Sequence, residues 1–273
     1  MATVPSERIA PHRTLVDYYG DDTRRAGFLC NLFDETAPNY DRIERLMGFG
    51  TGTWYRREAL VRAGLAPGMR VLDVAIGTGL VAREALAILN DSGSVVGLDP
   101  SPGMLYQARR GLGVPGILGY GEQQPFRAAS FDFLSMGYAL RHLCDLTATF
   151  AEFARVLRPG GRLCLLELTR PPGRLARGAL RIYLSGIVPL GTWLATGKRN
   201  AAQLMRYFWS TIDACVPPQE IVAALDAAGF VAVQRTLVLG LFSEYTARKP
   251  DPGMAAAEMV AAATTSSSRV FSR

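Results

Sequence analysis

From Met69 onward, short apolar runs alternate with segments of helical periodicity. The apolar runs have the length and content expected of buried strands: "RVLDVA" (70–75), "GSVVGLD" (93–99), "PGILGY" (115–120), "FDFLSMGYAL" (131–140) and "RLCLLEL" (162–168). The helical segments between them are "LVAREALAILN" (80–90), "SPGMLYQARRGL" (101–112) and "DLTATFAEFARVLRPGG" (145–161). Ser101 stands where an N-cap would begin the second helix, and Pro159-Gly160-Gly161 would end the third.

The C-terminal part predicts a helix followed by a hairpin. "PPQEIVAALDAAGF" (217–230) has helical periodicity, and two strand-like runs flank Gly240 within residues 231–249. The runs are too close for a parallel crossover, so they are expected to pair antiparallel. The whole pattern predicts an α/β protein with a Rossmann-like, doubly wound, seven-stranded sheet that is mostly parallel and has a reversed terminal strand.

The remaining segments suggest the domain organisation. A main domain over 26–249 is expected to follow a flexible arm (1–25) and to precede a disordered tail (250–273) rich in Ala, Ser and Thr. Residues 26–66 predict N-terminal helices. Residues 170–215 are apolar and interrupted by Pro and Gly. This insertion reads either as ordinary helical structure or as a lid over an apolar substrate.

Composition narrows the class of protein. The chain has 273 residues, 49% of them hydrophobic, and a net charge of +6. Basic residues are scattered in pairs such as Arg24-Arg25 and Arg56-Arg57, which favours a solvated basic surface over a nucleic-acid site. Attraction to an anionic membrane and formation of a homodimer both stay open.

Cysteine spacing and the N-terminal pattern suggest a location. The four cysteines form no C-x-x-C pair, which argues against a zinc site or a disulfide framework, and no metal is expected. The N-terminus lacks a signal-peptide pattern, and no apolar run has membrane-spanning length. We therefore expect a cytoplasmic protein, with peripheral membrane contact left open.

The stretch "VLDVAIGTGL" (71–80) is the strongest chemical signal in the chain. Gly77 and Gly79 permit a tight turn and close approach of a ligand, and the next helix points its amides at the same place. Asp99 ends the following strand and can accept hydrogen bonds from ribose hydroxyls. Up to this point a dinucleotide site fits as well, because 77–82 satisfies G-x-G-x-x-G/A.

Further features favour a sulfonium cofactor over NAD. Asp73 precedes the loop by four residues, where a carboxylate would attract the cationic S-adenosylmethionine and repel a pyrophosphate. It could alternatively brace the glycine loop as a buried carboxylate. Two other features also favour S-adenosylmethionine over NAD. One is the strand–helix–turn–strand unit with its Pro-Gly-Gly turn, and the other is the reversed terminal strand.

These stretches, with "GLDPSPGML" and "VLRPGGRLCLLEL", resemble class I S-adenosylmethionine-dependent methyltransferases. A narrower resemblance lies in "FDETAPNYDRIERLMGFGTGTWYRRE" (33–58) and "YALRHLCD" (138–145), which are similar to segments of the ubiquinone/menaquinone C-methyltransferase family. The resemblance covers roughly 26–249. It implies transfer of a methyl group from S-adenosylmethionine to a small aromatic or apolar acceptor, with C-methylation of a quinol as the family's reaction.

The resemblance also implies roles for individual residues. Those implied to bind the cofactor are Asp73, Gly77, Thr78, Gly79, Asp99, Pro100, Met104, Gly121 and Glu122. Tyr40 and Arg141 match positions beside the methyl acceptor, where Arg141 could stabilise a phenolate. Arg141 could instead pair with Asp145 on the surface, and Met104 could be plain helix packing.

The chain departs from the family pattern near the expected pockets. Tyr120 replaces the acidic residue that takes the adenine amino group, Glu44 and Gly48 replace Asn and Ser, and His142 replaces the Asn after the arginine. A histidine there could act as a general base in O- or N-methylation, or be a hydrogen-bonded structural residue. O- or N-methylation of an aromatic natural product is therefore the chief alternative, followed by an NAD-linked oxidoreductase and a non-catalytic cofactor-binding protein.

Overall fold

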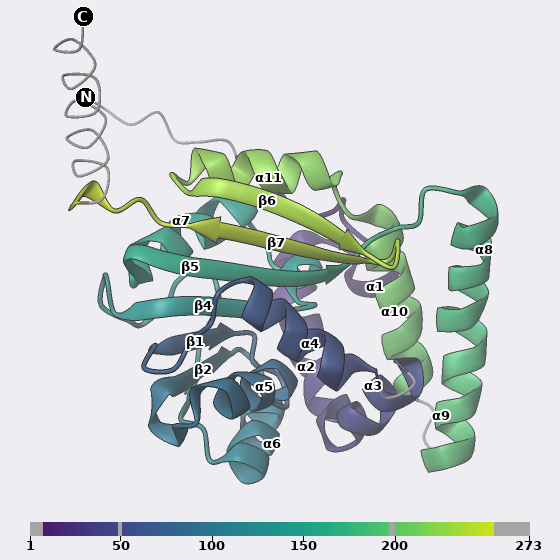
Figure 1. The fold of residues 1–273 in the computed structure, drawn as a ribbon. Coiled ribbons are helices and arrows are strands. Elements are labelled where there is room, and N and C mark those ends of the chain that lie inside the picture. Colours follow the sequence, from purple (N-terminus) through teal and green to yellow (C-terminus); the bar gives the residue numbers. More distant parts are fainter. Residues whose placement is uncertain (1–7, 49–50, 197–199, 254–273) are drawn as a thin grey trace, which may run out of the picture.

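A computed structural model describes residues 8–48, 51–196 and 200–253. Within these residues, seven strands form one sheet in the order β3-β2-β1-β4-β5-β7-β6, with helices on both faces (Figure 1). The parallel strands are β1 (Val71–Val74), β2 (Val95–Asp99), β3 (Gly116–Leu118), β4 (Phe131–Gly137) and β5 (Leu157–Leu168). The order reverses between β1 and β4, which makes a topological switch point at their carboxyl ends.

The predicted C-terminal hairpin is confirmed. β6 (Val231–Val238) and β7 (Phe242–Arg248) pair antiparallel, and β7 also pairs antiparallel with β5, from Arg162 opposite Arg248 to Leu168 opposite Phe242. Gly240 lies in the turn with a φ of +67°, a conformation that suits glycine. The Rossmann-like class with a reversed strand is therefore confirmed.

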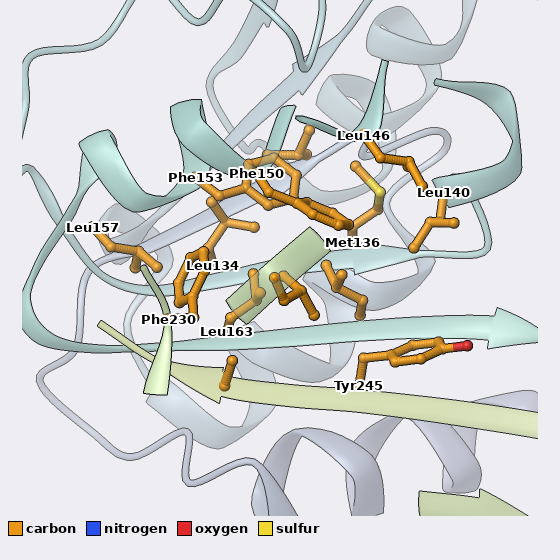
Figure 2. Packing of buried hydrophobic residues seen from close by; sticks show 14 of the residues in the cluster. Leu134, Met136, Leu140, Leu146, Phe150, Phe153, Leu157, Leu163, Phe230 and Tyr245 are labelled. Atoms are coloured by element: carbon orange, nitrogen blue, oxygen red, sulfur yellow. The ribbon is translucent and has the colours of Figure 1, made fainter. Parts of the chain in front are cut away.

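Alternate residues of the central strands pack on opposite faces of the sheet, as expected of strands that are buried on both sides. Leu134 and Met136 of β4 pack with Phe150 and Phe153 of α7 (Leu146–Val156) and with residues of α11 (Pro218–Ala227). Figure 2 shows this layer at close range. Phe133 of β4 faces the other layer, made by α4 (Gly52–Arg62), α5 (Leu80–Leu89) and α6 (Pro102–Leu112).

Two helix starts follow the local signals, whereas α7 ends at Val156 and the predicted stop Pro159-Gly160-Gly161 lies within β5. Ser101 caps α6, its side chain accepting from the backbone N–H of Met104 at 3.1 Å. Asp145 caps α7 by accepting from the N–H groups of Thr147 and Ala148. Because its carboxylate is used in this cap, the structure shows Asp145 as a capping residue and not as the partner of Arg141.

A helical layer covers the carboxyl ends of the strands. It contains α2 (Arg25–Thr36), η2 (Ala37–Asn39), α3 (Tyr40–Met47) and, from the insertion, α8 (Arg174–Ile182), the π-helical turn η5 (Tyr183–Ile187), α9 (Val188–Thr196) and α10 (Asn200–Ala214). Leu204, Tyr207 and Phe208 of α10 are buried against α2. The helices α8, η5 and α9 form one continuous rod that lies on the outer side of α10 (Figure 1). Part of the insertion is thus core, and only α8–α9 lies outermost.

The N-terminal arm differs from the expectation over its described part. Residues 8–25 pack on the domain: His12 bridges to Cys215, Tyr19 of α1 (Val16–Tyr19) is buried, and Arg25 is only 1% exposed. Arg25 has polar partners within the fold: its Nη2 lies 2.9 Å from His12 Nε2 and donates to the carbonyl of Arg141 at 3.0 Å. The polar composition of this segment suggested a loose arm. Its buried contacts could not be predicted because they involve partners that are distant in the sequence.

Most of the predicted tail, 254–273, lies outside the described residues. No helix in the described parts of the chain is long and apolar enough to cross a bilayer.

Candidate active site

The glycine loop leaves β1 at the switch point and leads into α5. Gly77 and Gly79 have φ values of +57° and +91°, and Gly79 is the N-cap residue of α5. A Cβ on Gly79 would lie 2.5 Å from Leu112 Cδ1 of α6. Gly79 therefore serves a close packing contact, while Gly77 borders the two cavities described below.

Asp99 holds the loop and faces the same space. Its Oδ2 accepts from the N–H of Gly77 at 2.8 Å, and its Oδ1 accepts from that of Ser101 at 2.9 Å. Burial raises the pKa of the Asp99 carboxyl to about 6, although these hydrogen bonds act in the opposite direction. The carboxyl stands where the sequence predicted it, at the end of β2.

Asp73 lies one strand away and is almost completely buried. Its Oδ1 accepts a 2.7 Å hydrogen bond from Ser135, while its Oδ2 has no partner among the described protein groups. Burial raises the pKa of Asp73 to about 7. A buried carboxylate oxygen without a donor suits a cationic ligand, since a cation would restore the ionised form.

A first cavity lies between α2 and the carboxyl ends of β1, β2 and β4, and we call it the adenosine cavity from the argument below. Its space measures about 880 Å³ with the open mouth included. It brings together the predicted residues Gly77, Asp99, Pro100, Met104, Gly121 and Glu122.

Helix α2 closes this cavity because Asp34 fixes the helix to the start of α6. The Asp34 carboxylate accepts from the Ser101 hydroxyl and, at 2.8 Å, from the N–H of Gly103. On the other side, Glu122 accepts from the N–H of Cys144 at 2.6 Å. Tyr120, which replaces the expected acidic residue, is half exposed at the rim.

A second cavity, which we call the acceptor cavity for the role proposed below, lies between α3, α4, η5 and the strand ends. It measures about 1310 Å³ with its mouth and is mainly apolar. Asp73 and Thr78 border this cavity and not the first one. Thr78 also donates to Asp41 of α3 at 2.6 Å.

The two cavities share a wall made of Tyr40, Ala75, Gly77, Gly137 and Tyr138. Three of the five have a left-handed backbone: Ala75 with φ +53°, Gly77 with φ +57° and Tyr138 with φ +60°. For non-glycine residues this conformation is strained and is typical of functional sites. The strain marks the place where ligands in the two cavities would meet.

Arg141 follows β4 in the 3₁₀ turn η4 (Leu140–His142) and reaches the acceptor cavity. Its side chain is fully buried. Nη1 pairs with Glu167 of β5, and Nε donates to Thr211 of α10 at 3.1 Å. The remaining nitrogen, Nη2, has no partner among the described groups, so one donor of this held guanidinium is available to a ligand.

His142, the next residue, borders the adenosine cavity and not the acceptor cavity. Its ring stacks at 5.5 Å on Tyr207 and at 5.6 Å on Phe208. Burial, with the nearby arginines, keeps the pKa of His142 well below 6.5. Consecutive residues of one turn therefore serve different cavities, and only Arg141 lies beside the acceptor space.

Arg56 is a site residue that the sequence pattern did not mark. It is only 3% exposed, and its Nη2 donates to Glu44 Oε1 at 2.6 Å, while Nε has no partner among the described groups. Its guanidinium lies 5.5 Å from the ring centre of Tyr138. The sequence feature that could have indicated Arg56 was Glu44, a carboxylate at a position where the family has an asparagine. The expected solvated basic surface is wrong for Arg25 and Arg56.

Together, the sheet order, the glycine loop and the acidic strand ends define a Rossmann-like methyltransferase fold. Solved structures agree: a SAM-dependent methyltransferase from Thermotoga maritima superposes with a TM-score of 0.57 at 20% identity, covering 81% of this chain and 99% of that one. The [4+2]-cyclase SpnF has a TM-score of 0.56 at 17% identity, covering 83% of this chain and 96% of its own. These likenesses show the fold.

The ubiE/COQ5 methyltransferase family model matches residues 21–249, and the chain belongs to that family. The demethylmenaquinone methyltransferase of Thermus thermophilus is 33% identical over 224 residues, which are 80% of this chain and 100% of that protein. The ubiquinone/menaquinone biosynthesis C-methyltransferase UbiE of Shewanella halifaxensis is 30% identical over 220 residues, 78% and 86% of the two chains. The predicted S-adenosylmethionine-dependent methyltransferase is therefore confirmed, and the NAD-linked alternative is not supported.

Proposed function

We propose that this protein transfers a methyl group from S-adenosylmethionine to a ring carbon of an apolar quinol. The observation that supports the proposal most directly is the wall shared by two cavities, one suited to a nucleoside and the other apolar with a guanidinium on its border. The relatives named above are called demethylmenaquinone and ubiquinone/menaquinone methyltransferases, which favours a quinol over other aromatic acceptors.

The residues present fit the cofactor at both ends. Asp99 would accept the ribose hydroxyls in the adenosine cavity, with Met104 against the base. Asp73, whose Oδ2 lacks a partner, would face the cationic methionine end from beside the acceptor cavity. When bound, S-adenosylmethionine supplies an electrophilic methyl group on a sulfonium. The carboxylates supply the negative charge that such a ligand needs.

Arg141 would act on the acceptor. A quinol that loses its hydroxyl proton becomes a phenolate, whose ring carbon beside the oxygen is nucleophilic. The Nη2 donor of Arg141 would stabilise the phenolate charge, as a preorganised donor in a water-poor site does most effectively. With the cofactor bound, its sulfonium would supply the methyl group to that ring carbon and retain the electron pair of the broken carbon–sulfur bond, and the ring would then release its own proton while Arg141 holds the oxygen.

Tyr40 would assist Arg141 as a neutral donor. Burial raises the pKa of the Tyr40 hydroxyl to about 12, with Arg141 acting in the opposite direction. The hydroxyl therefore stays protonated near neutrality and can donate to an acceptor oxygen at the shared wall. Correct positioning of the two reactants and exclusion of water would supply the rest of the rate enhancement.

The position of His142 separates the quinol proposal from its main alternative. O- or N-methylation with a histidine base would need that base beside the acceptor, yet His142 borders the adenosine cavity. The deciding experiment incubates the protein with methyl-labelled S-adenosylmethionine and either short-chain demethylated quinols or simple phenols and amines. A new carbon–methyl bond on a quinol is expected. Transfer only to oxygen or nitrogen would overturn the proposal.

A further inference from the structure

The arm formed by α8, η5 and α9 exposes large apolar side chains to solvent. Leu175 is 92% exposed and Leu194 is 71% exposed. Others with more than two fifths of their surface exposed are Ile182, Ile187, Leu190 and Trp193. Leu175 and Ile182 are seven residues apart, and Ile187, Leu190 and Leu194 follow at spacings of three and four, so they form a stripe along the arm. A surface of this kind marks an interaction site.

The same arm is basic and has no compensating acids. The sequence from Leu168 to Ile212 contains no Asp or Glu, while it contains several Arg and Lys residues. Arg174 and Arg181 of α8 are exposed beside the apolar stripe. Arg177 is held by a 2.6 Å ion pair with Asp213, which attaches α8 to α10. The arm thus combines an apolar stripe with adjacent, exposed positive charge.

The opposite side of this arm borders the acceptor cavity. Leu180, Tyr183 and Leu184 line that cavity, and the Tyr183 hydroxyl donates to the carbonyl of Met47 at 2.8 Å. Trp54 and Leu239, also at the cavity border, are 63% and 83% exposed. In Figure 1 the β6–β7 turn, which holds Leu239, ends on the side of the molecule where α8 stands. Exposed apolar side chains therefore lie both on the arm and at the border of the cavity.

We propose that the arm face, defined as the apolar stripe 175–194 with Arg174 and Arg181, docks on an anionic membrane surface. A helix with an apolar stripe, adjacent arginines and a tryptophan has the properties of an interfacial helix. The arginines match the charge of anionic lipid headgroups. The reason for such docking rests on the proposed function, because an apolar quinol dissolved in a bilayer would meet the cavity at the membrane surface.

Charge decides against a second copy of the chain as the occupant. A symmetric dimer through this face would bring the same surface of each copy together. The arm lacks acidic residues to oppose its arginines, so two such faces would place like charges against each other. An anionic bilayer satisfies both the apolar and the charged parts of the face.

The test measures binding of the full chain to vesicles of phosphatidylcholine alone or mixed with phosphatidylglycerol. We expect binding to the mixed vesicles that weakens with added salt. Arg174→Gln with Arg181→Gln should weaken it roughly 25-fold, from about fivefold per charge near the surface. The matched control, Arg109→Gln with Arg110→Gln, removes two exposed arginines from α6 and should bind like wild type.

The apolar part is tested by Leu175→Ser with Leu194→Ser, against Val61→Ser, an exposed position on α4. Only the arm variant should lose vesicle binding. Equal binding by arm and control variants, or an arm-dependent dimer without vesicle binding, would overturn the proposal. Activity on a water-soluble, short-chain quinol should be unchanged in the arm variants. If no quinol is methylated while arm-dependent vesicle binding persists, the proposed function fails and the docking surface stands.

Discussion

Arg141 and Glu167 form a buried ion pair between the turn after β4 and the end of β5. The pair joins neighbouring strands at their carboxyl ends, and Thr211 of α10 holds the Arg141 Nε at 3.1 Å. Two nitrogens of the guanidinium are therefore held by protein groups, and Nη2 has no partner among the described residues. Under the proposed function Glu167 would be a positioning residue, because it contacts Arg141 and would act on the acceptor only through it.

Glu167→Gln should lower turnover on the order of 10- to 100-fold, because a misplaced donor stabilises the phenolate poorly. Arg141→Lys should lower turnover by a similar or larger factor, since lysine cannot span the same partners. Cofactor affinity should stay close to wild type in both variants. Steady-state kinetics with calorimetry on S-adenosylhomocysteine separate these effects. If cofactor binding is lost along with turnover, the assignment of Arg141 to the acceptor is wrong.

Cofactor affinity should depend on pH through Asp73. The pKa of this carboxyl is raised to about 7 in the ligand-free protein, and a cationic ligand prefers the ionised form. Binding of S-adenosylmethionine should therefore release a proton, and affinity should fall roughly tenfold from about pH 8 to about pH 6. Calorimetry in buffers of different ionisation enthalpy measures the proton release. Asp73→Asn should bind the cofactor weakly, and its affinity should not change with pH. If the affinity of the variant still depends on pH, another group is responsible.

Asp73 should also destabilise the ligand-free protein at high pH. The folded-state pKa lies above the unfolded value of 3.8, so protonation favours the folded state below 3.8, and that contribution is lost as pH rises through about 7. Asp73→Asn should therefore raise the free energy of unfolding at about pH 8 by up to about 4 kcal/mol. Denaturant titration without cofactor checks this. The difference from wild type should shrink at about pH 5, and an unchanged difference would contradict the account.

Acid should destabilise the protein through His12. Burial and Arg25 lower the pKa of His12 to about 4, below the unfolded value of 6.5. The unfolded chain thus binds a proton that the folded chain does not, and stability is lost as pH falls from about 6.5 to about 4. His12→Gln, which keeps a polar partner for Arg25, should flatten this slope. Urea unfolding between about pH 6.5 and about pH 4 measures the free energy of unfolding of both proteins. If the variant keeps the pH dependence of the wild type, His12 is not the group responsible.

His142 should not titrate during catalysis. Because its pKa lies well below 6.5, the ring is neutral throughout the assay range. The pH profile of kcat for His142→Phe should therefore have the same shape as that of the wild type, with a lower value if ring stacking positions the turn. Loss of a limb near neutrality in the variant would instead identify His142 as a base.

Gly79 should be less tolerant of substitution than another left-handed glycine. Gly79→Ala adds both backbone strain and a Cβ 2.5 Å from Leu112, whereas Gly113→Ala, at φ +69°, meets nothing within 4 Å. Gly113→Ala should cost about 1–2 kcal/mol of stability, and Gly79→Ala more, with weaker cofactor binding. Thermal unfolding and calorimetry compare the two. Equal losses would mean that Leu112 moves aside.

Local features were predictable from the sequence, and distant pairings were not. Ser101 and Gly240 act within a few residues of their partners, and Asp99 is placed by the motif that ends β2, so motif and turn chemistry placed all three correctly. Arg25 and Arg56 resembled surface residues because their partners, His12 and Glu44, are brought to them only by helix packing. The division of Arg141 and His142 between two cavities depends on how α10 packs, which no local pattern encodes.

The placement of Asp73 and Thr78 bears on the order in which ligands bind. Asp73 and Thr78, residues assigned to the methyl donor, border the space assigned to the acceptor. A quinol that binds first would lie against an unfilled carboxylate and would block access to it. The donor that binds first completes the surface on which the quinol rests. The protein should therefore follow a compulsory-order kinetic sequence, with the donor first and the demethylated donor released last.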